Sequence, residues 1–217
     1  MTKLNSISAK NYLWLGIFFG VLIWSAIEPK DRLTWLLEAG PAIIGLVILV
    51  KTRTKFPLTS LLYKWILLHC IVLMIGAKYT YAEVPLFDSI SVMFGWERNN
   101  YDKVGHFMQG FVPALLTREI LIRKQVVHSS GWMFFIITSI CLAFSAFYEL
   151  IEWWAALLFG QDADAFLGTQ GYAWDTQSDM LYALIGAISC LFILRSIHDR
   201  QLNSLPCQSG HCELIAK

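Results

Sequence analysis

Charged residues are scarce in this chain. Asp, Glu, Lys and Arg make up 15% of its 217 residues, whereas a typical soluble domain has about a quarter. Hydrophobic residues make up 56%, and the mean hydropathy is +0.53. The formal net charge of +1 leaves little excess positive charge with which to bind nucleic acid. The composition therefore favours a membrane protein and gives no support for a nucleic-acid partner.

Lys and Arg are absent from Gln125 to Leu194, although this stretch contains six carboxylates. Because charge beside hydrocarbon is costly and usually marks a functional site, these acids need an explanation. We therefore expect a polar site on one face of the membrane, built around the stretch from Phe147 to Ala187. The six carboxylates are Glu149, Glu152, Asp162, Asp164, Asp175 and Asp179.

The cysteines do not form the pattern of a disulfide framework. Cys207 and Cys212 stand with His211 in the C-terminal segment CQSGHC, which offers too few ligands at an unfamiliar spacing for a metal centre. We interpret this segment as a solvated tail. The other cysteines lie inside apolar runs, where Cys is most often a small hydrophobic residue: Cys70, Cys141 and Cys190.

Long apolar runs predict an all-α fold, a polytopic bundle of six transmembrane helices. The first run resembles a signal peptide, but no A-x-A cleavage pattern follows it, so we expect an uncleaved span. The chain is expected to form one membrane domain, with a short surface helix near Phe87–Trp96 and a cytoplasmic tail from 198 to 217. The expected spans are Tyr12–Ile27, Leu33–Val50, Leu58–Thr80, Lys103–Ile122, Gly131–Leu158 and Asp179–Ile197.

The distribution of basic residues predicts the orientation. Six spans place both termini on one side, and cytoplasmic segments of membrane proteins are enriched in Lys and Arg. With the termini inside, the outer segments hold four basic residues, Lys30, Arg32, Arg98 and Lys103, while Lys64 and Lys78 fall within spans. The inner segments then hold eleven: Lys3, Lys10, Lys51, Arg53, Lys55, Arg118, Arg123, Lys124, Arg195, Arg200 and Lys217.

This orientation brings polar residues of three spans to the same outer depth. Each pair is spaced i, i+3 or i, i+4, so that its members share a helix face. The interfacial residues Trp153 and Trp154 suit that depth. The pairs are Asp102 with His106, Glu149 with Glu152, and Asp175 with Asp179.

Such a cluster has three plausible chemical uses. Carboxylates with one histidine can hold a divalent metal ion, which activates water or polarises a phosphate ester. Two close carboxylates can share a proton and relay it. The acids can also bind a cationic ligand directly. As metal ligands we consider Asp102, His106, Glu149, Glu152, Asp175 and Asp179, with Asp102, His106, Glu149 and Asp179 as candidate catalytic residues.

Structural roles are open for the same residues. Asp102 and Lys103 can be an ordinary pair at a helix start, and the histidine can hydrogen-bond a neighbouring span. Asp179 can be the N-cap of the sixth span, a position that Asp fills well. Glu149 can form a salt bridge with Lys78 or Lys103.

Three segments resemble the YjdF family of bacterial inner-membrane proteins: YDKVGHFMQGF (Tyr101–Phe111), YELIEW (Tyr148–Trp153) and YAWDTQSDMLYALIGA (Tyr172–Ala187). The resemblance implies a multi-span inner-membrane protein and no particular reaction. A more distant similarity links the chain to the VanZ-like family, which is associated with glycopeptide resistance. Ala183 stands where that pattern usually has Asn, and Trp153 near a usual Gln. The matching residues are Asp102, Lys103, His106, Glu149, Asp179 and Gly186.

These observations lead to one preferred function and two alternatives. We expect an outward-facing site that binds a divalent metal ion or a polar lipid headgroup and supports modification of an envelope lipid. The first alternative is a small transporter or proton-coupled carrier. The second is a non-catalytic envelope or stress-associated protein. No phosphatase or protease motif selects among them.

Overall fold

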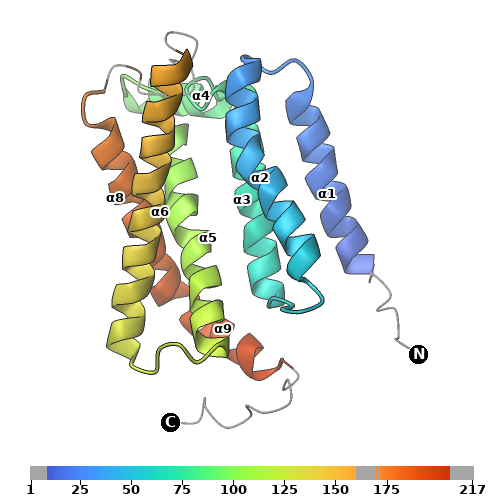
Figure 1. Ribbon diagram of the computed structural model, residues 1–217. Helices are drawn as coiled ribbons and strands as arrows, with labels where there is room; N and C mark the ends of the chain where they lie inside the picture. The colour runs from blue at the N-terminus through green and yellow to red at the C-terminus, as the bar shows by residue number, and fades with distance from the viewer. Residues whose placement is uncertain (1–8, 160–169, 171, 206–217) are drawn as a thin grey trace. The chain divides into compact units, whose positions relative to one another are not determined.

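The computed structural model describes residues 9–159, 170 and 172–205 (Figure 1). These residues form helices and no β-strand, which confirms the predicted all-α class. Asp162, Asp164, Cys207, His211 and Cys212 lie outside the described residues. The helices are α1 (Ala9–Ala26), α2 (Arg32–Thr52), α3 (Ser60–Tyr79), α4 (Pro85–Phe94), α5 (Tyr101–Arg123), α6 (Ser130–Phe159), α8 (Asp175–Ile193) and α9 (Arg195–Asn203).

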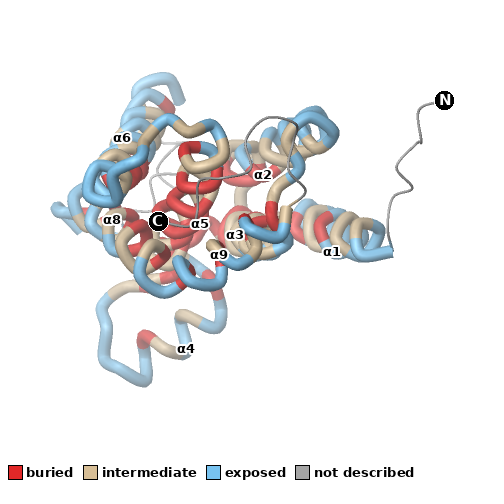
Figure 2. Tube along the Cα trace, turned by 90° about the horizontal axis from the view of Figure 1, so that it is seen from below, coloured by how far each residue is buried: buried red, intermediate tan, exposed pale blue. Residues whose placement is uncertain are grey.

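Five helices, α1, α2, α3, α6 and α8, are long and apolar enough to cross a membrane. The remaining predicted span, Lys103–Ile122, corresponds to α5, whose 23 residues rise about 35 Å at 1.5 Å per residue. Charged side chains make α5 less apolar than the others. Several polar side chains of α5 are buried, and so are many of its other residues (Figure 2). Burial keeps charges away from lipid, so a polar helix of this length can still cross.

The sixth predicted span, Asp179–Ile197, differs from the structure at both ends. Helix α8 begins four residues earlier, at Asp175, with Trp174 as its N-cap, so Asp179 is not an N-cap. The helix ends at Ile193, and Leu194 separates it from α9. The sequence beyond Leu194 is polar, and α9 buries His198 and Leu202. Polar residues with buried partners therefore end the apolar helix earlier than its hydrophobic pattern suggested.

Two compact units divide the chain, and α2, α3, α5 and α6 each contribute residues to both. That the chain forms one membrane domain stays a prediction. Unit 1 comprises Met1–Ile48, Leu67–Gly105 and Glu152–Ala173. Unit 2 comprises Leu49–Ile66, His106–Ile151 and Trp174–Lys217.

Aromatic packing and one lysine organise unit 1. Tyr81 and Tyr101 are buried together, with their ring centroids 5.7 Å apart. The Lys78 ammonium donates hydrogen bonds to the carbonyls of Ile27, at 2.6 Å, and Trp24, at 3.3 Å. Because the last carbonyls of a helix lack partners within that helix, Lys78 on α3 caps the end of α1. Helix α4 follows, close to the predicted surface helix, and ends at Gly95 with φ of 65°.

Close backbone contact between α5 and α8 defines unit 2, where the two helices lie alongside α6 (Figure 1). A Cβ atom added at Gly110 would overlap the backbone carbonyl of Ala183, and one added at Gly186 would overlap that of Phe107. Small residues let membrane helices approach in this way and gain van der Waals contacts. The glycines therefore set the separation of the helices that carry His106 and Asp179.

Candidate functional site

Three of the predicted site residues come together in unit 2, one from each of three helices. His106 lies on α5, Glu149 on α6 and Asp179 on α8. Their exposed fractions are 6%, 9% and 3%, so all three are buried. Asp179 precedes Ala183 by one turn and His106 precedes Gly110 by one turn. The close α5–α8 contact therefore brings these two polar residues to face each other.

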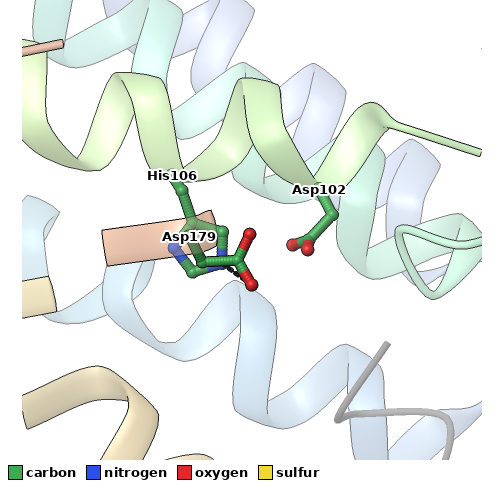
Figure 3. Close-up of side chains that lie close together, drawn as sticks. All are labelled: Asp102, His106 and Asp179. Atoms are coloured by element: carbon green, nitrogen blue, oxygen red, sulfur yellow. Dashed lines mark ion pairs between the residues drawn. The ribbon is translucent and has the colours of Figure 1, made fainter. Parts of the chain in front are cut away.

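The histidine stands at ion-pair distance from both carboxylates. His106 Nε2 is 3.8 Å from Asp179 Oδ2 (Figure 3), and His106 Nδ1 is 4.0 Å from Glu149 Oε1. The prediction that Glu149 and His106 lie close together on facing helices agrees with this distance. Both distances exceed the roughly 2.7–3.2 Å of a hydrogen bond.

Gln109 determines how the imidazole is oriented. His106 Nδ1 lies 3.0 Å from Gln109 Oε1, one turn further along α5. A carbonyl oxygen only accepts hydrogen bonds, so Nδ1 carries the proton and donates it. In the neutral ring, Nε2 then presents its lone pair toward Asp179. Metal-binding histidines usually donate the N–H of their other ring nitrogen to an oxygen in this way, which sets the tautomer of the ring.

The other three predicted residues stand one helical turn from this group. Asp102 precedes His106 by four residues on α5, and Figure 3 shows both side chains on that helix. Glu152 follows Glu149 by three residues on α6, and Asp175 precedes Asp179 by four on α8. Asp102 and Glu152 belong to unit 1 and Asp175 to unit 2. Asp102 and Asp175 are buried, and Glu152 is half-buried.

The proposed structural partners of Glu149 have contacts of their own in unit 1. Lys78 caps α1, as described above. Lys103 Nζ lies 5.8 Å from the centroid of the Tyr172 ring. The salt bridge of Glu149 with either lysine stays a prediction.

A second buried polar cluster in unit 2 was not predicted from the sequence. Glu119 on α5 and His198 on α9 are both fully buried, with His198 Nε2 3.1 Å from Glu119 Oε2. Thr59 donates its hydroxyl to the same carboxylate at 2.8 Å, and Arg123 donates to it at 2.8 Å. Arg118 contacts His198 Nδ1 at 3.0 Å and also bonds Asp199 at 2.6 Å. We call these six residues the Glu119 network.

The Glu119 network differs from the His106 group in its hydrogen bonding. Its contacts lie at ordinary hydrogen-bond distances, so its charges are compensated within the protein. Glu119 follows His106 by 13 positions, which correspond to about 20 Å along α5. The i, i+4 spacing of Glu119 and Arg123 was visible in the sequence, but it is typical of any exposed helix face. The network is therefore a structural feature, separate from the candidate site.

Comparison with known proteins supports the predicted resemblance. The family described as "Predicted membrane protein (DUF2238)" matches residues 10–200. The chain is 52% identical over 182 residues to "Inner membrane protein YjdF" of Escherichia coli (strain K12), covering 84% of this chain and 87% of that protein. No solved structure matches. With its apolar helices, the chain is a multi-pass inner-membrane protein, and the similarity to VanZ-like proteins stays a prediction. The chain therefore belongs to the DUF2238 family of predicted membrane proteins.

Proposed function

We propose that this protein binds a divalent transition-metal ion through His106 and Asp179 and uses it to modify an envelope lipid. The observation that carries the proposal is the placement of His106 between Gln109 and Asp179. When Nδ1 donates its proton to Gln109, the neutral ring presents the Nε2 lone pair to the carboxylate of Asp179, 3.8 Å away. Two electron-rich atoms that face each other in a buried place are stabilised by a cation between them, whether a proton or a metal ion.

The distances suit a metal ion. Two ligands held about 2.0–2.1 Å from a tetrahedral metal ion are about 3.3 Å apart. The 3.8 Å separation of His106 Nε2 from Asp179 Oδ2 requires only a small contraction to reach that value. The 4.0 Å separation from Glu149 is measured from Nδ1, which carries the proton, so it does not describe a pair of metal ligands. A histidine with carboxylates favours zinc, iron or manganese over magnesium or calcium, which prefer oxygen ligands alone. Asp175, one turn from Asp179 on α8, and Glu149 on α6 are further ligand candidates within unit 2.

Orientation decides which substrate the site can reach. The excess of Lys and Arg in alternate loops favours cytoplasmic termini, which places the start of α5 and the end of α6 at the outer face. There a metal ion would meet lipid headgroups of the outer leaflet. A bound metal ion can lower the pKa of water or polarise a phosphate oxygen, so the proposed substrates are envelope lipids with polar headgroups.

The test of metal binding is elemental analysis of the detergent-purified protein beside two variants, Asp179→Asn and His106→Gln. We expect close to one metal ion per chain in the wild type and a loss of about tenfold or more in affinity in each variant, as when a direct ligand is removed. Asp199→Asn is the matched control, because it neutralises a carboxylate of the Glu119 network and should retain the metal. Wild-type protein without stoichiometric metal, after growth in metal-replete medium, would contradict the proposal.

A proton-coupled carrier is the second candidate function. The same buried histidine between two carboxylates can share and release a proton. The measurement is proton flux in liposomes that contain the purified protein. Flux that disappears in His106→Gln, from protein that contains no metal, would favour the carrier. Absence of both metal and flux would leave the non-catalytic envelope protein.

A further inference from the structure

Helix α4 in unit 1 turns its apolar stripe outward. Hydrophobic residues at positions 86, 90, 93 and 94 are spaced i, i+4, i+7 and i+8, which places them on one face of the helix. A helix of a soluble protein packs such a stripe against the core. In α4, however, Leu86, Met93 and Phe94 are 66%, 72% and 64% exposed, and Ile90 is half-buried. Exposed apolar surface of this kind marks a site of membrane or protein interaction.

The other face of α4 is fixed to the rest of unit 1. Ser91 is buried, and its hydroxyl donates a hydrogen bond to the carbonyl of Arg98 at 2.8 Å. The Asn99 side-chain amide donates to Asp88 Oδ1 at 2.6 Å. Phe87 packs against the buried aromatic cluster described above. The helix could not rotate its stripe inward without breaking these contacts, so the outward orientation is built into unit 1.

Short connections hold α4 at the level of the membrane boundary. The apolar helix α3 ends at Tyr79, and α4 begins at Pro85. Between them Glu83 forms an exposed ion pair with Lys30 at 2.8 Å, as suits the headgroup layer. The rings of Tyr79 and Trp24 lie 6.1 Å apart, and such aromatic residues are enriched at membrane interfaces. Figure 2 shows α4 extending to one side of α3 instead of continuing along it, so α4 stays near this boundary.

We propose that α4 is an interfacial helix whose apolar stripe inserts into the lipid leaflet at this end of unit 1. Lipid is the occupant because the stripe is uncharged and the adjoining helices α1 and α3 also expose apolar side chains, such as Ile23 and Leu68. An amphipathic helix at this level buries its apolar face about 5–10 Å into the boundary between headgroups and acyl chains. Through Ser91 and Asp88, the inserted helix would fix the depth of the segment that leads into α5. The inference is independent of the proposed metal site.

The experiment measures the depth of α4 in liposomes that contain the purified full chain. In protein with all native cysteines replaced, Met93→Cys and Leu86→Cys are each labelled with an environment-sensitive fluorophore. The liposomes contain lipids with a nitroxide quencher on the headgroup, high on the acyl chain or deep in it. We expect the strongest loss of fluorescence from the quencher high on the acyl chain, because the stripe inserts about 5–10 Å. Both labels should be protected from iodide supplied on both sides of the membrane.

Glu97→Cys with the same fluorophore is the matched control. Glu97 is exposed and belongs to the same unit, but it is charged and lies beyond the end of α4. Its label should be quenched by iodide and only weakly by nitroxides on the acyl chains. Equal acyl-chain quenching at Met93 and Glu97 would mean that the fluorophore itself enters the lipid, and the proposal would be overturned.

The remaining outcomes separate lipid from other occupants. Quenching of the Met93 label by iodide alone would place the stripe in water, and protection from every quencher would mean that a second copy of the chain covers it; either result overturns the proposal. A further variant tests the stripe itself. Met93→Glu should move the label at Leu86 toward the headgroup quencher, because a carboxylate is costly in hydrocarbon. Since Met93 is 72% exposed, Tm in detergent should not change. An unchanged depth of the Leu86 label would contradict insertion.

Discussion

Unit 2 contains two buried histidines, His106 and His198, whose surroundings differ. The difference distinguishes a candidate site from a structural contact. His198 is enclosed by Glu119 and Arg118 at 3.0–3.1 Å, with both ring nitrogens in hydrogen bonds. His106 Nδ1 lies 3.0 Å from Gln109, and the carboxylate neighbours of His106 stand at 3.8 and 4.0 Å. A satisfied network stabilises one conformation, whereas a looser arrangement of opposite charges leaves room for a ligand.

Stability measurements should distinguish the two groups. Glu119→Ala removes the acceptor for Thr59, His198 and Arg123 and leaves positive charge buried, so we expect a loss of about 3–5 kcal/mol. For a chain of this length that corresponds to a decrease in Tm on the order of 10 °C. Asp179→Asn should cost less than about 1 kcal/mol in metal-free protein, because the side-chain volume is kept and the 3.8 Å separation from His106 is longer than a hydrogen bond.

The measurement is thermal unfolding in detergent after treatment with a chelator. Chelation matters, because a bound metal ion would stabilise the wild type and not the Asp179 variant. Equal losses of Tm for Glu119→Ala and Asp179→Asn would indicate that Asp179 also has a structural role, and the site would then lose its main support.

The sequence predicted His106, Glu149 and Asp179 as neighbours because each lies at the same predicted depth of a separate span. Helical spacing places residues within one helix, and membrane depth compares residues of different helices. Neither indicates which helix faces are turned toward each other. The contact between Glu119 and His198 joins residues 79 positions apart. It requires the break between α8 and α9 at Leu194, which was not predicted from the sequence.

At the scale of elements, the α5–α8 contact determines the geometry of the site. Gly110 and Gly186 bring the two backbones together, and Asp179 faces His106 about one turn from that contact. The role of these two glycines could not be predicted from the sequence. Glycine is common in membrane helices, and at several other glycines of this chain an added Cβ atom would meet no neighbouring atom. Gly45 in α2 is one example, with no heavy atom within 4 Å of an added Cβ.

Substitution of Gly110 should therefore disturb both packing and metal binding. In Gly110→Ala the new methyl group overlaps the Ala183 carbonyl, so α8 must move and we expect a loss of about 1–3 kcal/mol. The movement would widen the His106–Asp179 separation and weaken metal binding.

Gly45→Ala is the matched control for Gly110→Ala. It should leave the metal content unchanged and raise stability by up to about 1 kcal/mol, since Ala has the higher helix propensity. Tm and metal content measured on both variants provide the check. A Gly110→Ala protein with wild-type Tm would mean that the two helices are further apart than described.

At the scale of the whole molecule, the sequence predicted six spans, and α5 is the one of them whose helix is not apolar enough to cross on composition alone. The predicted span boundaries outside α8 agree with the helix ends to within a few residues. α5 combines a full span's length with buried Asp102, His106, Arg118 and Glu119. A charged helix of this kind crosses only inside a bundle, where its polar groups meet protein instead of lipid. If it crosses, the chain has six spans and both termini on one side.

Orientation is the prediction on which the envelope-lipid role depends. Eleven basic residues against four favour cytoplasmic termini, so Ala173, just before α8, should face outward and Thr54, just after α2, should face inward. Both residues are exposed.

In a variant with all native cysteines replaced, a membrane-impermeant maleimide applied to intact spheroplasts should label Ala173→Cys fully. The same reagent should label Thr54→Cys only after the membrane is opened. The reverse pattern would move the metal site to the cytoplasmic leaflet and exclude periplasmic headgroups as substrates. Labelling of both positions on one side would contradict six spans, because Thr54 and Ala173 lie on opposite sides when α3, α5 and α6 all cross; with α3 and α6 crossing, it would mean that α5 does not.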